Sequence, residues 1–298
     1  MQRGAPPQKF ARPVLRPGAR AGTAFTANLA AAVAQIQANT PGVAGGCDAE
    51  YLHQLRVGIR RLRSTLRVFR SLLKRKQAAR FDRRLREALS GMGAARDWDV
   101  FEAAFGSPAL QRHARRHAQA ARRRARATAR SPQFRYLSDE VLAWARGGPW
   151  RESAQPREAL LDFAQRALEQ KRERLIESAE GIDWRDAARR HRVRIRVKRL
   201  RYGCECFAAA WNEEQVQPLL GRLRRLQEIL GELNDIDVQR QLLQDLAHTA
   251  APAAQVGAAM RMLAQREQPL LADLRRAWRK FVEISPYWRP RAAAPAAG

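Results

Sequence analysis

Apolar residues recur through most of the chain at spacings of three and four, and few runs alternate with the period of two that marks a strand. Ala, Leu, Arg, Glu and Gln, which are good helix formers, are abundant throughout. The pattern therefore predicts an all-α protein. We expect helices at residues 24–39, 49–75, 78–93, 98–127, 133–146, 157–178, 184–211, 213–232, 236–249 and 253–283.

Gly and Pro residues cluster in three stretches, which predict where helices are interrupted. These stretches are NTPGVAGG at 39–46, GGPWRESAQP at 147–156 and the C-terminal RPRAAAPAAG. Pro269 is expected to break or kink the last helix, because proline removes a backbone donor. The middle stretch is the best division of the chain. We expect a disordered basic arm at 1–22, a first helical bundle at 23–150, a second at 151–288 and a disordered tail at 289–298.

The stretch HQLRVGIRRLRSTLRVFR, residues 53–70, carries two stripes at helical spacing. Apolar residues from Leu52 to Leu73 step by three and four and predict the face that packs in the core. Basic residues follow one position later, so their stripe is turned by about 100°. No acidic residue lies between positions 51 and 81, so these like charges repel unless an anion such as phosphate bridges them. The basic positions are His53, Arg56, Arg60, Arg63, Arg67, Arg70 and Lys74, and Arg61 widens the stripe.

The chain also contains an internal repeat at an offset of 138 residues. HQLRVGIRRLRSTLRVF at 53–69 aligns with HRVRIRVKRLRYGCECF at 191–207, and MGAARDWDV at 92–100 aligns with LGELNDIDV at 230–238. Two ungapped matches at one offset indicate a duplication, in which each half is a helical bundle that pairs with its twin. The second copy keeps the apolar seam and a shorter basic stripe, made of His191, Arg194, Lys198 and Arg201.

Two aspartate pairs, Asp97 with Asp99 and Asp235 with Asp237, allow two interpretations. An Asp-x-Asp pair could ligate a metal ion for phosphate chemistry. We favour helix capping, because Asp97 and Asp235 follow a glycine and a helical run and would therefore stand at the start of the next helix. In that position they would also orient basic side chains. Repulsion from the nearby arginines would also oppose the binding of a metal cation.

His113 and His117 stand four residues apart and could form a metal pair on one helix face. The surrounding QRHARRHAQAARRRARA is rich in arginine, which favours a solvated or accessory anion-binding helix. We therefore predict no metal site, no cofactor and no catalytic residue.

Composition adds the strongest argument about partners. The 298 residues include 56 Lys and Arg against 29 Asp and Glu, a formal net charge of +27. Such an excess predicts an anionic partner. Nearly all of it is arginine, whose planar guanidinium can grip a phosphate with two hydrogen bonds.

Cysteine usage and hydropathy predict a cytoplasmic protein. Cys47, Cys204 and Cys206 are an odd number in a long chain, so no disulfide framework is implied. The N-terminal residues lack the continuous apolar segment of a signal peptide, and no stretch predicts a membrane span. The sequence carries no signal of oligomeric state.

The repeated motifs resemble the CHAD domain, an α-helical domain named for its histidines. The resemblance rests on two copies of H-x-x-R-h-x-x-(R/K)-R-L-R, at 53–63 and 191–201, and on two Gly-to-Asp-x-Asp-Val segments, at 93–100 and 231–238. It covers residues 24–288. It implies two four-helix bundles related by a pseudo-twofold axis, with the basic residues of both copies lining a central groove or pore.

The resemblance also implies a ligand, long-chain inorganic polyphosphate, and association with polyphosphate granules. From helix geometry and the repeat we add Arg67, Arg84 and Arg222 to the expected ligand-binding residues. The motif itself implies His53, Arg56, Arg60, Arg61, Arg63, His191, Arg194, Lys198, Arg199 and Arg201.

Three functions are compared on these features. A non-enzymatic polyphosphate receptor is favoured. Some members of the family that this chain resembles are fused to a triphosphate tunnel domain with an E-x-E-x-K motif, and since no such motif occurs here, the resemblance implies a stand-alone binding module. A nucleic-acid-binding protein would also suit the charge, but Phe69 and Phe207 lie on the core seam and cannot stack on bases. The third function is a metal-dependent phosphohydrolase that uses the aspartate pairs. The sequence shows no second carboxylate cluster and no nucleophile–base pair that would support this function.

Overall fold

The computed structural model describes residues 6–16, 18–46, 49–152, 155–247 and 253–289. Within these ranges the protein is built of helices and short 3-10 turns without a strand, so the expected all-α class is confirmed. The helices are α1 (Ala21–Gly45), α2 (Ala49–Val68), α3 (Arg75–Gly91), α4 (Gly93–Ala104), α5 (Pro108–Arg130), α6 (Pro132–Gly147), α7 (Leu160–Glu177), α8 (Ala187–Phe207), α9 (Glu213–Ala247) and α10 (Ala253–Glu283). The 3-10 turns are η1 (Arg70–Leu72), η2 (Pro149–Glu152), η3 (Gln155–Arg157) and η4 (Ala208–Ala210).

A Ser-Pro pair explains one difference from the predicted helices. The Ser107 hydroxyl accepts a hydrogen bond from the backbone N–H of Leu110, and Pro108 takes the first position of α5. This cap satisfies a donor that the helix leaves open, and proline lacks the N–H that would be unpaired there. The single helix expected at 98–127 is therefore wrong, because α4 ends at Ala104 and α5 starts anew. A second Ser-Pro pair starts α6 in the same way.

Two other helices, α1 and α9, run further than expected, and α10 keeps its expected bounds. Most of the linker expected at 39–46 is helical, because α1 continues through Pro41 and ends at Gly45, and Gly46, with a φ of 78°, forms the left-handed cap that follows it. The break expected after residue 232 is absent, since α9 is one helix, and α10 continues through Pro269. Each of these helices is held along its length by tertiary packing, which outweighs local propensity.

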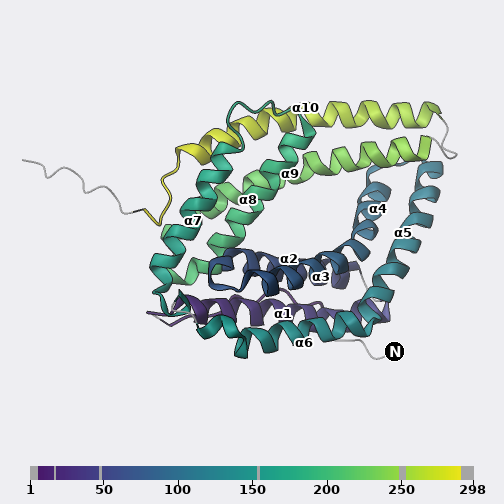
Figure 1. Ribbon diagram of the computed structural model, residues 1–298. Helices are drawn as coiled ribbons and strands as arrows, with labels where there is room; N and C mark the ends of the chain where they lie inside the picture. The colour runs from purple at the N-terminus through teal and green to yellow at the C-terminus, as the bar shows by residue number, and fades with distance from the viewer. Residues whose placement is uncertain (1–5, 17, 47–48, 153–154, 248–252, 290–298) are drawn as a thin grey trace, which may run out of the picture.

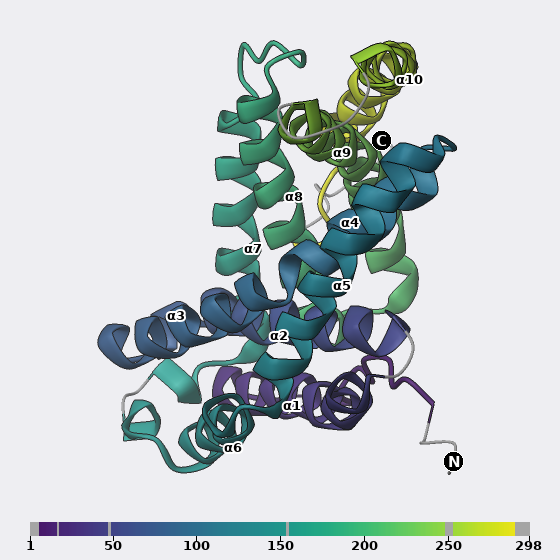
Figure 2. The ribbon, with the colours of Figure 1, turned by 90° about the vertical axis from the view of Figure 1, so that its right-hand side faces the viewer.

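The helices form a frame around a centre. Figure 1 shows α1, α2, α3 and α6 along the bottom, α7 and α8 rising on the left, and α9 and α10 running across the top. On the right, α4 and α5 join the top to the bottom, and Figure 2 shows them crossing in front of the other helices when the molecule is turned by 90°. The inner sides of the frame belong to α2, α4, α8 and α9.

The two apolar seams predicted from the sequence are confirmed as core positions. Their central residues have no exposed surface, and the outer ones are buried or partly buried. The fully buried members are Leu55, Ile59, Leu62 and Phe69 on α2 and its end, and Val193, Val197, Leu200, Cys204 and Phe207 on α8.

Four phenylalanines join the two halves of the chain in the main core. The ring of Phe69 lies 5.1 Å from that of Phe207 and 5.5 Å from that of Phe163. The ring of Phe25 lies 5.6 Å from that of Phe69. Phe25 aligns with Phe163, and Phe69 with Phe207, at the repeat offset. This cluster fixes how α2 and α8 cross, because aromatic rings packed edge to face resist sliding.

A second, smaller core lies where α4 and α5 meet the facing ends of α9 and α10. Phe101 and Ala114 from the first half pack there with Leu243 and Leu263 from the second, and all four are fully buried. Both cores thus draw on residues before and after the middle linker.

The helix boundaries follow the repeat offset of 138 residues. Helix α2 begins at Ala49 and α8 at Ala187, while α3 begins at Arg75 and α9 at Glu213. The first half uses two helices, α3 and α4, over the length that α9 spans as one.

The N-terminal residues that the structure describes pack against the first half. The backbone N–H of Gln8 donates to Asn39 Oδ1 at 3.1 Å, and the Arg61 guanidinium lies 4.1 Å from the Phe10 ring centroid. The arm expected at 1–22 thus makes specific contacts over its described part, and its last residues belong to α1. Residues 1–5, Cys47 and nearly all of the tail expected at 289–298 lie outside the described residues.

None of the described helices is both long and apolar enough to cross a membrane.

Candidate anion-binding site

Three basic side chains from both copies of the motif meet where α2 and α8 cross. Arg60 comes from α2, and Arg194 and Lys198 come from α8. All three influence one another electrostatically, together with Asp97 of α4 and Asp235 of α9. We call these five residues the central cluster. The repeat places Arg60 and Lys198 at equivalent positions.

Lys198 shows how strongly positive the central cluster is. Burial lowers the pKa of its ammonium to about 7, and repulsion from Arg194, Arg60 and Arg201 acts in the same direction. The carboxylate of Asp235 opposes the shift without cancelling it. A lysine in this state gains charge when an anion approaches, because the anion stabilises the protonated form.

The acidic members do not neutralise the cluster fully. The surrounding protein raises the pKa of the Asp97 carboxyl, and nearby Asp235 adds to this effect. The cations Arg56, Arg60 and Arg194 act in the opposite direction. Burial and repulsion from Arg60 lower the pKa of Arg194, whose buried Nε has no hydrogen-bond partner in the described part of the chain. Two arginines and a lysine that is only partly protonated at neutral pH thus face two carboxylates, one of which holds its proton more readily than usual.

Several arginines of the predicted stripe are already paired with carboxylates. Arg63 Nε lies 2.9 Å from Asp82 Oδ1, and an Arg67 terminal nitrogen lies 3.0 Å from Asp82 Oδ2. Burial of Asp82 opposes its ionisation, but hydrogen bonds from the two arginines outweigh it and lower the pKa of the carboxyl. Arg84 is ion-paired with Glu140 of α6. The expectation that the stripe lacks acidic partners is wrong at these positions.

Glu205 does the same for a second pair of arginines. Its carboxylate lies 2.8 Å from a terminal nitrogen of Arg61 and also pairs with Arg201 one helical turn away. Glu205 is 9% exposed, and Arg201 also donates to Gln227. The sequence shows only that a glutamate replaces an arginine here; the structure shows that it holds two cations.

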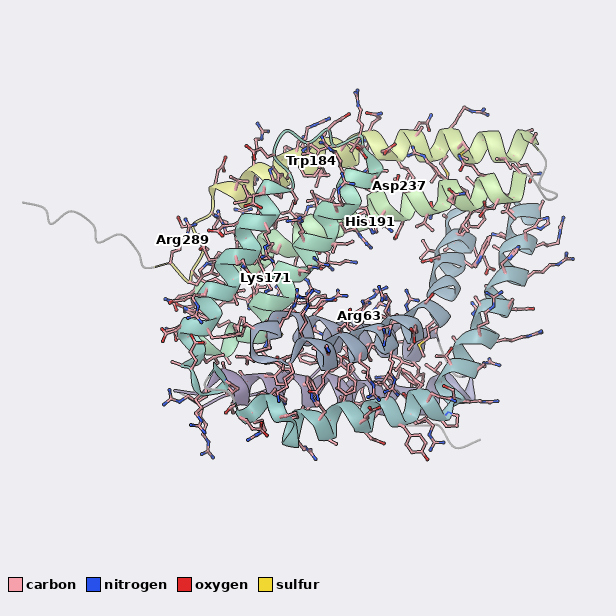
Figure 3. The ribbon with its side chains drawn as sticks, viewed as in Figure 1. Arg63, Lys171, Trp184, His191, Asp237 and Arg289 are labelled. Atoms are coloured by element: carbon pink, nitrogen blue, oxygen red, sulfur yellow. The ribbon has the colours of Figure 1, made fainter. Side chains whose placement is uncertain are left out.

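The remaining predicted residues are spread over the inner and outer surfaces. Arg56 is buried and donates to the backbone carbonyl of Met92. His53 and His191 are both exposed, and Nδ1 of His191 lies 3.2 Å from the side-chain oxygen of Asn234. Figure 3 shows Arg63 on the lower inner side of the frame and His191 at its upper left. Arg222 is exposed on α9, and no interaction links it to the central cluster in the described residues.

The aspartates do not cap helices. Asp97 lies inside α4 and Asp235 inside α9, so the capping prediction is wrong, although Asp235 does face the basic side chains. Asp237 binds the buried guanidinium of Arg190 through both oxygens at 3.0 Å, which agrees with an orienting role. Glu267 lies 3.2 Å from the same guanidinium. Nothing can be said of the Asp99 side chain, which lies outside the described side chains.

The described residues contain no group of three or more His, Cys, Asp or Glu side chains that could hold a metal ion. His117 instead stacks on Trp98, with ring centroids 4.5 Å apart and planes 13° from parallel.

A cavity of about 940 Å³ lies beside the crossing of α2 and α8, and two predicted residues, Arg67 and Arg199, line it. We call it the basic cavity. Sequence reasoning missed its other side, which Arg166, Lys171 and Arg174 of α7 provide; Lys171 and Arg174, three residues apart, lie on one helix face. That spacing was a usable signal, but α7 lies outside the repeated motif.

Comparisons with known proteins agree with this architecture. The family model described as CHAD domain matches residues 27–244. The crystal structure of the CHAD domain from the plant Ricinus communis superposes with a TM-score of 0.83 at 29% identity, covering 95% of this chain and 98% of that one. PptA from Streptomyces chartreusis superposes with a TM-score of 0.68 at 16% identity, covering 89% of this chain and 99% of that one, which shows a shared fold. Comparison with curated proteins finds no match.

Proposed function

The chain belongs to the CHAD domain family, and from this premise we propose that it binds long-chain inorganic polyphosphate through the central cluster and the basic residues around it. The observation that carries the proposal is the meeting of Arg60, Arg194 and Lys198 from the two motif copies. Like charges held together in this way leave a positive potential that a polyanion can satisfy.

The chemistry of the cluster suits a linear phosphate chain. Each phosphate unit presents oxygens that can bridge neighbouring guanidinium groups with charge-assisted hydrogen bonds. Each added unit reaches another basic residue and releases condensed counterions, so affinity should rise with chain length and fall steeply with salt. Aromatic side chains at base-stacking positions are missing from this set, since Phe69 and Phe207 are buried in the core.

The proposal includes the arrangement of the two halves. Residues 23–150 and 151–288 are duplicated bundles related by a pseudo-twofold axis, and the central cluster lines a groove or pore between them. The equal offsets of the helix starts and of the paired phenylalanines support this relation.

We propose binding without turnover, with polyphosphate granules as the place where the protein acts. Phosphate release from polyphosphate in the presence of magnesium ions tests the first part. If the protein releases phosphate and the variants Asp97→Asn and Asp235→Asn do not, the proposal of binding without catalysis is wrong and the protein is a phosphohydrolase.

The central experiment is a competition. Labelled long-chain polyphosphate is bound to the full chain at physiological salt and challenged with duplex DNA, RNA and ATP at equal phosphate concentration. We expect none of these to displace it. Displacement by DNA or RNA would favour a general nucleic-acid binder instead.

A matched pair of double variants tests the residues. Arg60→Glu with Lys198→Glu should weaken long-chain binding by about a hundredfold, because each reversal turns an attraction into a repulsion. Arg275→Glu with Arg279→Glu, two exposed positions on α10, changes the net charge equally and should cost about twofold or less. Helix content measured by circular dichroism shows that both variants fold.

A further inference from the structure

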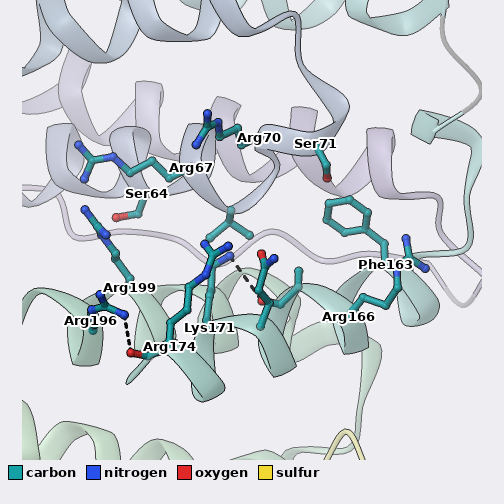
Figure 4. Close-up of a pocket in the computed structure, with 13 residues that line it drawn as sticks. Ser64, Arg67, Arg70, Ser71, Phe163, Arg166, Lys171, Arg174, Arg196 and Arg199 are labelled. Atoms are coloured by element: carbon teal, nitrogen blue, oxygen red, sulfur yellow. Dashed lines mark hydrogen bonds between the residues drawn. The ribbon is translucent and has the colours of Figure 1, made fainter. Parts of the chain in front are cut away.

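The basic cavity is open to solvent and is lined by residues of α2 with η1, of α7 and of α8. Figure 4 shows Arg67 and Arg70 on one side and Lys171, Arg174, Arg196 and Arg199 on the other, with Phe163 at its edge. Ser64, Ser71 and Gln170 add hydrogen-bonding groups. The seven cations that line it are Arg67 and Arg70 from α2 and η1, Arg166, Lys171 and Arg174 from α7, and Arg196 and Arg199 from α8.

Few of these cations are neutralised by the protein. Arg67 is paired with Asp82, and Arg166 lies 2.5 Å from Glu158. The other five have no ion pair with a carboxylate in the described part of the chain, and no described carboxylate lines the cavity. Burial and the nearby guanidinium groups lower the pKa of Lys171 to about 8, although Cys206 and Cys204 oppose this. The protein thus gathers cations here at a cost in repulsion that a bound anion would lower.

The repeat supplies a counterpart that lacks these features. Five of the aligned positions line a space of about 10 Å³ between α1, α2 and α8, which we call the closed cavity; they are Asn28, Arg61, Tyr202, Glu205 and Cys206. There Glu205 pairs with Arg61, and the Phe10 ring covers the Arg61 guanidinium. The aligned pairs are Arg67 with Glu205, Arg70 with Ala208, Arg166 with Asn28, Lys171 with Val33, Arg174 with Ile36, Arg196 with Gly58 and Arg199 with Arg61.

We propose that the basic cavity is a second anion site, separate from the central cluster, which binds a compact ligand carrying three or more clustered phosphate groups. Six of its seven cations have no basic counterpart at the aligned position, so the fold alone does not require them. Its volume lies within the range of small-molecule sites, about 300–1,000 Å³. Cations on three sides surround a compact polyanion, whereas an extended chain would contact only some of them at a time.

Clustered phosphate groups could come from the end of a polyphosphate chain or from a free phosphorylated metabolite. Inorganic triphosphate is the probe for the chain end, and inositol hexakisphosphate is the probe for the metabolite. Isothermal titration of the full chain with each probe gives affinity and stoichiometry. Tighter binding of triphosphate identifies the chain end as the source, and tighter binding of inositol hexakisphosphate identifies the metabolite.

The variant Arg174→Glu with Arg196→Glu tests the site. It should weaken binding of the tighter probe by about tenfold or more, because two phosphate contacts become repulsive. The control Arg275→Glu with Arg279→Glu carries the same charge change outside the cavity and should stay within about twofold of the unmodified protein. Lys171→Met, which removes one charge and keeps the shape, should give a smaller loss in the same direction.

The outcomes separate this site from the proposed function. Loss of compact-probe binding in the cavity variant, with long-chain binding nearly unchanged, supports two sites. Three results would overturn the proposal: no binding of either probe, equal loss in the control, or loss only when Arg60 and Lys198 are reversed. Failure of long-chain polyphosphate to bind would remove the proposed function and leave these measurements valid.

Discussion

The basic cavity and the closed cavity occupy aligned positions of one duplicated framework and have opposite characters. The first is about 940 Å³ and gathers seven cations, whereas the second is about 10 Å³ and holds a buried ion pair. Arg199 and Arg61 are equivalent, so both cavities keep one arginine of the motif. The residue next to that arginine differs: Arg67 lines the basic cavity, and the aligned Glu205 lines the closed cavity. A change of charge at a few positions thus distinguishes the basic cavity, which we propose binds an anion, from the closed cavity, where a carboxylate of the protein pairs with the arginine.

The two carboxylates that bridge arginines extend the comparison. Glu205 joins Arg61 to Arg201 in the closed cavity, where it is almost fully buried. Asp82 joins Arg63 to Arg67 beside the basic cavity, where its side chain is 25% exposed. The same bridging pattern should therefore contribute more to stability on the closed side, since water screens it less.

The largest expected effect comes from Glu205→Gln. Losing this charge leaves Arg61 and Arg201, which are only 20% and 12% exposed, without their shared partner and should lower the free energy of unfolding by about 3 kcal/mol. Urea unfolding measures the change. Glu228→Gln, an exposed site that pairs with Arg225, is the control and should cost about 0.5 kcal/mol or less. Equal losses in the two variants would show that the closed cavity is not held by its ion pair.

The second effect is the pH dependence of polyphosphate binding, which we expect from the protonation of Lys198 on α8. Lys198 has a pKa of about 7 in the free protein, so above that pH it must take up a proton when a polyanion binds. Affinity for polyphosphate should therefore fall as pH rises through 7, by up to about tenfold per pH unit, and should be flat below it for this group. Lys198→Arg keeps its charge, so this dependence should vanish.

Calorimetry in buffers of different ionisation enthalpy counts the protons directly. Unmodified protein should take up protons on binding at pH above 7, and Lys198→Arg should take up fewer. An unchanged proton count in the variant would assign the titration to another group.

The third effect is Asp82→Asn, which should cost about 1 kcal/mol at neutral pH because its ion pairs are partly exposed. The folded-state pKa of Asp82 lies below its ordinary value of 3.8, so its contribution exists above that value and is lost as pH falls through the folded pKa. The variant and the unmodified protein should therefore converge in stability in acid. A difference that persists at low pH would point to packing and not to charge.

The smallest effect is Phe10→Ala. Removing the ring over Arg61 should lower the free energy of unfolding by about 0.5 kcal/mol, the value of an exposed cation–π contact. We expect no new binding of inositol hexakisphosphate, because Glu205 still neutralises the cavity. A gain of binding would show that the ring, and not the carboxylate, closes it.

Some of the candidate site could be predicted from the sequence and some could not. The stripe that contains Arg60 and the aligned Lys198 follow from periodicity and repeat, and the structure brings them together. The ion pairs of Arg61 and Arg63 could not be foreseen, because Glu205 lies 144 residues from Arg61 and Asp82 lies on the next helix. The spacing of Lys171 and Arg174 was visible in the sequence, but only packing shows that α7 reaches the cavity.

The sequence by itself determined the all-α class, the two buried seams and the offset that relates the halves. These are local properties, because the 3.6-residue turn fixes which side chains share a helix face wherever the helix lies. Tertiary structure alone decided that α9 is continuous, that Asp97 lies within a helix, and which arginines have carboxylate partners. Charge balance depends on distances between elements far apart in the chain, and only the packed helices set those distances.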